Sequence, residues 1–334
     1  YYRFPMKYAI YSSKGKELTV LHEVPLIEDL PKGFMAVRTG PRNFSWRSDK
    51  PSNLIFVEAL DGGNPEKDIK YRDEIFEVGY PFKHNKVSLL KTINRFYRID
   101  WCNDTLALGY DYWWNTRNTK TYVFSPSNSN KKPEIIIDRN YQDRYNDPGS
   151  FVKRRNFYGK SILAVNKQNL YLMGDGFRDD GQFPFIDQLN LKSLKKVRLY
   201  ESSFKDKKED ILDFEADNNM ILTRIESATD YPNYFFRDLK TNDITKITDF
   251  DNPFLSIMEV SKEIIEYKRF DGIDLSATLY LPKGYNINKK QKLPMIMWAY
   301  PREFKDNNSA SQITQNKNEF TFPYWGSPIY WLTR

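Results

Sequence analysis

Short runs in which apolar and polar residues alternate fill most of the 334-residue chain, and Gly, Pro, Asn, Asp and Ser separate them. A period of two residues is typical of β-strands with one buried face, and the separating residues favour tight turns. A helical period of about 3.6 residues is nearly absent. The pattern therefore predicts a mainly β protein built of short antiparallel strands.

These runs form a repeated unit of two hairpins. In the inner hairpin an apolar anchor precedes a polar turn and an apolar strand, and the anchors are Trp46, Trp101, Val165 and Phe214. The outer hairpins are predicted over residues 74–90, 121–137, 185–199 and 234–247. Two hairpins make a four-stranded antiparallel sheet of about 40–50 residues, which is typical of a β-propeller blade. A β-sandwich with coincidental spacing is the alternative at this point.

Residues 6–21 have the pattern of an outer hairpin with no inner hairpin before it. Half a blade would leave an unpaired strand edge, which folded proteins avoid. We therefore expect a partial β-propeller of about four and a half blades over residues 1–258, in a native chain that begins further upstream.

The pattern changes near residue 259. A hairpin is predicted over residues 263–280 with its turn at Asp271-Gly272-Ile273. The continuous apolar run Leu293–Tyr300 is typical of a strand in a sheet that is covered on both faces. We expect residues 259–334 to begin a second, doubly wound domain, which continues in the native protein past this sequence.

Composition and charge exclude several classes of protein. Aromatic residues make up 16% of the chain, whereas disordered chains are poor in them. The single cysteine, Cys102, excludes a disulfide scaffold. No apolar run approaches the roughly 18 residues of a membrane span. The net charge of +7 permits a nucleic-acid partner, but the basic residues are spread along the chain, so we expect none.

The search for catalytic and ligand-binding motifs is mostly negative. The chain contains no Gly-x-Ser-x-Gly nucleophile elbow and no Gly-x-Gly-x-x-Gly loop. Gly159-Lys160-Ser161 resembles the end of a P-loop, but a strand pattern follows it where a helix is needed. His22 and His84 lie far apart in the sequence, and Cys102 has no partner at ligand spacing. We therefore expect neither a metal nor a cofactor.

Residues 267–285 resemble the entry into the catalytic domain of the prolyl oligopeptidase family. Within that family, residues 293–305 (Leu-Pro-Met-Ile-Met-Trp-Ala-Tyr-Pro-Arg-Glu-Phe-Lys) and 325–330 resemble the glutamyl endopeptidase branch. Upstream, residues 46–65, 142–150 and 232–240 agree with it. The resemblance implies a β-propeller of four-stranded antiparallel blades, followed by the first strands of an α/β-hydrolase domain. It also implies a serine peptidase with a Ser-Asp-His triad, which cleaves peptides after Glu while the propeller limits access.

One site residue follows from the resemblance, and a second candidate lies beside it. The family aligns Tyr300 with a residue whose hydroxyl helps to form the oxyanion hole; the alternative is a hydroxyl that only caps a turn. Arg302 lies two residues further on, where its guanidinium could pair with a substrate glutamate; the alternative is a salt bridge with Glu303. The family places the whole triad after residue 334, so we expect this chain by itself to be inactive.

Three functions remain open on the sequence. The leading interpretation is a serine peptidase that acts on peptide substrates. The second is a non-catalytic β-propeller that binds a protein partner, and the third is a basic module that binds nucleic acid with a steep salt dependence. Related bacterial enzymes often work outside the cytoplasm, so we expect a periplasmic or other extracytoplasmic location. The oligomeric state is open.

Overall fold

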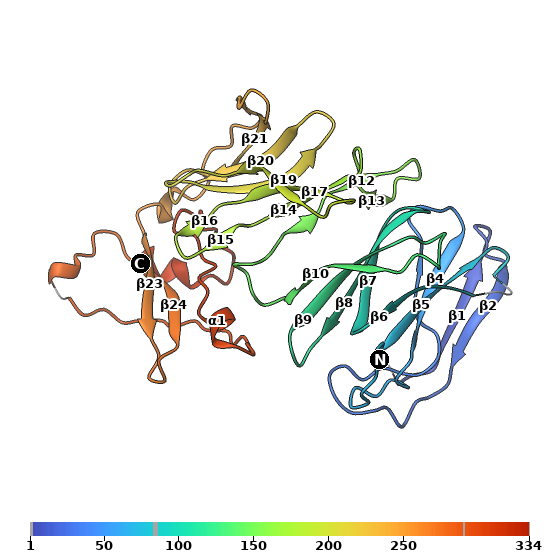
Figure 1. The fold of residues 1–334 in the computed structure, drawn as a ribbon. Coiled ribbons are helices and arrows are strands. Elements are labelled where there is room, and N and C mark those ends of the chain that lie inside the picture. Colours follow the sequence, from blue (N-terminus) through green and yellow to red (C-terminus); the bar gives the residue numbers. More distant parts are fainter. Residues whose placement is uncertain (1–2, 83–85, 290, 334) are drawn as a thin grey trace. The chain divides into compact units, whose positions relative to one another are not determined.

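The computed structural model describes residues 3–82, 86–289 and 291–333 (Figure 1). The chain divides into two compact units, residues 1–141 with 153–164, and residues 142–152 with 165–334. Each unit contains two four-stranded antiparallel sheets. The predicted mainly β chain of four-stranded antiparallel units is therefore confirmed.

The first unit opens with a hairpin of β1 (Met6–Tyr11) and β2 (Glu17–Val24). Its first four-stranded sheet has the order β3–β4–β5–β6, with bounds Arg42–Trp46, Asn53–Ala59, Asp73–Gly79 and Val87–Thr92. The second has the order β10–β9–β8–β7, where β7 is Arg95–Asn103, β8 Leu106–Trp113, β9 Asn118–Phe124 and β10 Glu134–Asn140. A short hairpin of β12 (Lys153–Arg155) and β13 (Ser161–Leu163) completes the unit.

The second unit holds the other two sheets. The first has the order β11–β14–β17–β18, with bounds Ser150–Phe151, Asn169–Gly174, Phe185–Asn190 and Lys196–Glu201. The second has the order β19–β20–β21–β22, with bounds Lys208–Glu215, Met220–Glu226, Asn233–Asp238 and Ile244–Lys246. Two hairpins accompany them, β15 (Phe177–Arg178) with β16 (Gly181–Gln182), and β23 (Ser261–Lys268) with β24 (Asp274–Leu281). The helical elements are η1 (Leu255–Ile257), η2 (Ile287–Lys289), α1 (Asn307–Ala310) and η3 (Pro328–Thr333).

Three of the four predicted anchors lie in strands, and the fourth does not. Val165, the anchor predicted for the third sheet, lies outside the strands, and β11 instead supplies the edge strand of this sheet and pairs Phe151 with Leu172. Residues 150–152 and 161–164 are both short apolar runs, so periodicity alone could not choose between them. Gly149 turns the chain at φ +84°, and a Cβ there would lie 2.2 Å from the Met173 carbonyl oxygen. Only glycine permits this approach.

The predicted strand Leu293–Tyr300 does not form. No strand is assigned to it, and Met295 and Trp298 are 74% and 75% exposed. A strand of a covered parallel sheet needs a neighbour for its backbone hydrogen bonds and a helix over each face. None of the strands in the described ranges pairs with this run, and the prediction of a buried strand here is wrong.

The two sheets of the first unit share one apolar core and one buried ionic network. The core contains Ile55 and Val57 of β4, Ile75 of β5, and Trp101 and Ala107 of the next sheet. Ile55 and Val57 occupy alternate positions of β4, and Leu54 and Phe56 on its other face belong to a second apolar cluster, so this strand is buried on both faces.

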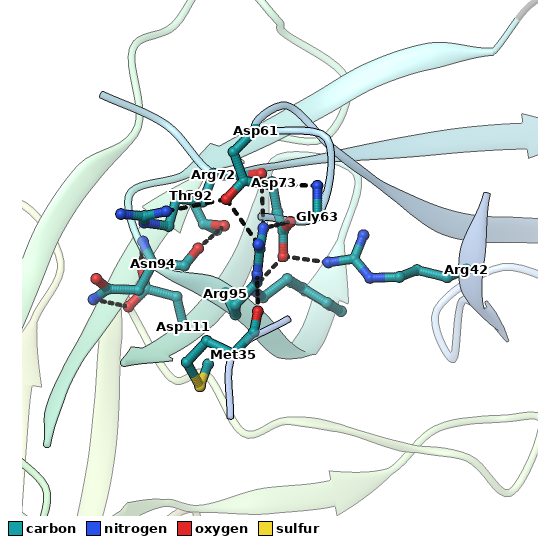
Figure 2. Close-up of polar contacts among 11 residues, drawn as sticks. Met35, Arg42, Asp61, Gly63, Arg72, Asp73, Thr92, Asn94, Arg95 and Asp111 are labelled. Atoms are coloured by element: carbon teal, nitrogen blue, oxygen red, sulfur yellow. Dashed lines mark hydrogen bonds and ion pairs between the residues drawn. The ribbon is translucent and has the colours of Figure 1, made fainter. Parts of the chain in front are cut away.

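Figure 2 shows the buried network that links the same two sheets. Arg95 donates to Asp61 over 2.7 Å and to Asp73 over 3.0 Å, and Arg42 donates to Asp73 over 2.5 Å. The backbone N–H of Gly63 also donates to Asp61. A Cβ at position 63 would lie 1.9 Å from the Val37 carbonyl oxygen, so this position requires glycine. Asp61 and Asp73 each have two guanidinium partners, so these charges compensate one another inside the protein.

Candidate functional site

A pocket of about 1340 Å³ lies entirely within the second unit, and both Tyr300 and Arg302 line it. Its walls come from the loop after β10, from the turn around β15, from the β23–β24 hairpin and from the segment that follows Tyr300. Its other lining residues that matter here are Gln142, Arg144, Asp175, Arg269, Glu303, Lys305, Asp306 and Gln312.

The segment after Tyr300 ends in α1, a single helical turn with a side-chain cap. Asp306 is the N-cap residue, and its carboxylate accepts from the backbone N–H of Ser309 over 2.7 Å. An aspartate cap satisfies a donor that the helix itself cannot, and its negative charge suits a helix N-terminus. The capped turn reverses the chain, so the residues before and after α1 both meet the loop after β10.

Two glutamines join these segments in a reciprocal way. The Gln142 carboxamide donates to the Glu303 carbonyl oxygen over 2.6 Å and accepts from the Lys305 N–H over 3.3 Å. The Gln312 oxygen accepts from the Arg144 N–H over 2.6 Å, and its nitrogen donates to Asp143 over 2.8 Å. We call residues 142–145 the docking loop, because the segments before and after α1 both bond to it.

The charge on Asp143 is favoured by its surroundings. Partial burial acts to raise the pKa of this carboxyl, but hydrogen bonds from Asn146 and Gln312 outweigh burial and hold the pKa below its ordinary value. The carboxylate therefore stays ionised and keeps its hydrogen bond to Gln312 at neutral pH.

Four cationic side chains line the pocket, and three of them have acidic partners. Arg144 pairs with Asp175 over 2.5 Å, Arg269 pairs with Asp271 over 2.6 Å, and Lys305 pairs with Glu303 over 2.7 Å. For the fourth, Arg302, the described ranges provide no acidic partner. An exposed guanidinium without a partner is available to an anion in the pocket.

The structure brings both site residues predicted from the sequence to one place. The alternative for Arg302, a salt bridge with Glu303, does not form, because Glu303 pairs with Lys305 instead. Tyr300 is 85% exposed, and its hydroxyl makes no hydrogen bond within the part of the chain that is described, so it does not cap a turn. Both polar groups thus remain accessible from the pocket.

The sequence reasoning missed the docking loop and the other pocket cations. Residues 142–150 resembled the family, but no feature of Gln142 or Arg144 alone pointed to a role. Their partners lie more than a hundred residues further along the chain. Only the fold could reveal these contacts.

Among the described ranges no group of three or more His, Cys, Asp and Glu side chains could hold a metal ion. His22 contacts Arg38, and His84 lies outside the described residues. No helix in the described part of the chain has the length and apolarity to cross a membrane.

Two curated proteins are similar to this chain over almost its whole length. It is 35% identical over 351 residues to a probable glutamyl endopeptidase, chloroplastic, of Arabidopsis thaliana, covering 99% of this chain and 36% of that protein. A protein of the same name from Oryza sativa subsp. japonica is also 35% identical, with 99% and 37% covered. The chain belongs to the family of these glutamyl endopeptidases. It spans about a third of the length of these relatives.

Other comparisons add little to the glutamyl endopeptidase assignment. No protein-family model matches the chain. Oligopeptidase B from Leishmania major is 8% identical with a TM-score of 0.40, over 73% of this chain and 39% of that one. The acylaminoacyl peptidase of Pyrococcus horikoshii is 12% identical with a TM-score of 0.40, over 84% and 36%. Similarities this weak do not decide the fold.

Proposed function

We propose that the full protein is a serine-type peptidase that cleaves peptides after Glu, and that the pocket beside Tyr300 and Arg302 forms part of its substrate site. The observation that carries the proposal is Arg302, the one pocket cation whose charge no acid in the described ranges neutralises. The name of these relatives, probable glutamyl endopeptidase, is consistent with an anionic substrate side chain.

Arg302 would recognise the substrate. A guanidinium presents a planar fork of N–H donors that can hold a carboxylate in a bidentate pair. Its neighbours in the pocket are already paired with acids, so a glutamate that enters would find Arg302 as the free cation. Binding there would select a negatively charged side chain over its neutral isostere.

Tyr300 would stabilise the transition state. A phenol hydroxyl aimed at a developing oxyanion donates a hydrogen bond that strengthens as negative charge forms, and removing one such donor typically costs about 10²–10³ in kcat. The nucleophile and the rest of the triad would come from the remainder of the protein.

The four sheets would form part of a β-propeller that limits access to peptides, and residues 259–334 would open the α/β-hydrolase domain. The extracytoplasmic location stays a prediction.

The test uses the full-length protein and two fluorogenic peptides that differ only by Glu or Gln at the cleaved residue. We expect cleavage of the Glu peptide to exceed that of the Gln peptide, and a fluorophosphonate probe to label the active-site serine and block it. A protein that is folded, unlabelled and inactive on both peptides would contradict the proposal.

Two variants separate the proposed roles. Arg302→Gln should lower kcat/KM for the Glu peptide by about 10–100-fold, mostly through KM, and change the Gln peptide little, because a charge-assisted pair is lost. Tyr300→Phe should lower kcat about 10²-fold on both peptides, with KM nearly unchanged. Equal losses on both peptides for Arg302→Gln, or full turnover for Tyr300→Phe, would remove the respective role.

A further inference from the structure

The backbone that carries Arg302 is held by a side chain from elsewhere in the chain. The Gln142 carboxamide donates to the carbonyl oxygen of Glu303 and accepts from the N–H of Lys305. These are the two bonds that a residue of a parallel strand makes with the residues on either side of its neighbour. The side chain thus replaces a partner strand for a segment that has no regular secondary structure.

We call the two hydrogen bonds of the Gln142 side chain the clamp. The clamp holds the backbone directly after Arg302. Arg302 is bonded through one peptide link to Glu303, whose carbonyl receives the shorter of the two hydrogen bonds, at 2.6 Å. Fixing that carbonyl restricts the backbone on the C-terminal side of Arg302 and so limits the directions in which its guanidinium can point. Arg302 has no acidic partner among the described residues that could orient it instead.

The docking loop is itself fixed, so the clamp has a rigid support. Arg144 pairs with Asp175, which lies between β14 and β15. On the far side of α1, the Tyr145 hydroxyl accepts from the Ile313 N–H over 3.0 Å. The segment between Glu303 and Ile313 is therefore bonded to the docking loop at both ends.

We propose that Gln142 is a positioning residue, which fixes the backbone at Glu303 and Lys305 and thereby aims Arg302 at an acidic substrate side chain in the pocket. The inference rests on the proposed function, because it assigns Gln142 a part in the same recognition. Gln142 does not itself touch the reacting atoms. Its effect should appear in the preference for Glu over Gln, with kcat on the Gln peptide little changed.

The first measurement does not depend on catalysis. Hydrogen–deuterium exchange of the full-length protein would measure the amide exchange rate in a proteolytic fragment that covers residues 301–306. In Gln142→Ala we expect about 10-fold faster exchange there, since the Lys305 N–H loses its acceptor. Gln188→Ala is the matched control, because Gln188 lies on β17 of the same unit and its side chain makes no hydrogen bond within the described residues. Unchanged exchange in Gln142→Ala would overturn the clamp.

The second measurement reads the preference for Glu. Gln142→Ala should lower kcat/KM for the Glu peptide by about 10-fold, mainly through KM, and the Gln peptide should be affected much less. A loss of general stability would reduce both rates equally, and such a result overturns the positioning role. Faster exchange with an unchanged Glu preference overturns it as well. If the wild-type protein shows no Glu preference, the proposed function fails, and the exchange experiment still decides whether the clamp exists.

Gln142→Glu supplies a pH signature that a simple structural defect would not give. The ionised carboxylate cannot donate to the Glu303 carbonyl and repels it, whereas the protonated form regains the donor. The ratio of variant to wild-type activity on the Glu peptide should therefore rise as the pH falls toward the pKa of the introduced carboxyl. A flat ratio across this range would count against the donor role of Gln142.

Discussion

At the scale of single residues, Asp111 shows how a buried charge is accommodated. Its carboxylate is fully buried and accepts from the Asn94 N–H, from the Asn94 amide, from the Tyr122 hydroxyl and from the Lys120 N–H, over 2.6–3.0 Å. Burial raises the pKa of Asp111 although hydrogen bonds from Tyr122 and Asn94 oppose the shift. All four groups donate hydrogen bonds, two to each carboxylate oxygen, so both terminal atoms of this side chain must be acceptors.

Asp111→Asn should therefore destabilise the protein by about 1–3 kcal/mol, because one amide N–H₂ would face donors and leave them without an acceptor. Urea denaturation would measure the free energy of unfolding. Asp243→Asn, at an exposed position in the β21–β22 turn, is the control and should change stability by less than about 0.5 kcal/mol. Equal stability of Asp111→Asn and wild type would show that the four hydrogen bonds do not require a carboxylate.

The candidate site shows how far single residues could be predicted. Tyr300 and Arg302 were chosen from the sequence, and the structure places both at one pocket. Whether Arg302 is free depends on which cation Glu303 prefers, and Lys305 lies at a similar distance along the chain. That choice depends on side-chain directions in an irregular segment, which the order of residues does not determine.

At the scale of elements, the residues after α1 are bound to the β19–β20 sheet through a buried acid. Lys208 pairs with Glu319 over 2.9 Å, and the Phe320 N–H donates to Glu226 over 3.1 Å. Glu226 is 1% exposed, and its second carboxylate oxygen has no hydrogen bond. Burial raises the pKa of Glu226 in spite of nearby Lys208 and of Arg224, whose Nε lies 3.4 Å from that second oxygen.

A raised pKa has a definite sign in the pH dependence of stability. The folded protein binds the Glu226 proton more tightly than the unfolded chain, so this group adds stability as the pH falls from its folded pKa toward the ordinary 4.5. Glu226→Gln has no proton to bind there. The stability of wild type minus that of the variant should therefore increase with falling pH over this range.

Denaturation series at several pH values would test this expectation. Glu263→Gln, at an exposed position of β23, is the control, and its difference from wild type should not vary with pH in the same way. A wild-type advantage that shrinks as the pH falls would mean that the ion pair with Lys208 dominates over burial at Glu226.

The elements themselves were largely predictable, and the exceptions share a cause. The hairpins were predictable because each is a local pattern of strand, turn and strand. Local patterns do not determine pairings between distant runs, so the pairing of β11 with β14 was not predicted and Val165 was predicted as the anchor of that sheet. The run Leu293–Tyr300 has strand composition, but a strand also needs a partner, and the described part of the chain offers none.

At the scale of the whole molecule, the proposed function divides binding and chemistry between parts of the chain. The described residues line a pocket that contains the Arg302 guanidinium and the Tyr300 hydroxyl, to which we assign binding and stabilising roles. They supply no nucleophile elbow, since no Gly-x-Ser-x-Gly occurs in the sequence.

We therefore expect residues 1–334 alone to cleave neither the Glu peptide nor the Gln peptide, whereas the full-length protein cleaves the Glu peptide. Stabilising an oxyanion accelerates a reaction only when a nucleophile creates that oxyanion, so Tyr300 without the triad has no transition state to stabilise. The assay would compare equal molar amounts of both proteins, with Tyr300→Phe in the short chain as a check for contaminating peptidase. Turnover by the short chain that disappears in Tyr300→Phe would show that these residues contain a nucleophile of their own, and the proposed division between binding and chemistry would be wrong.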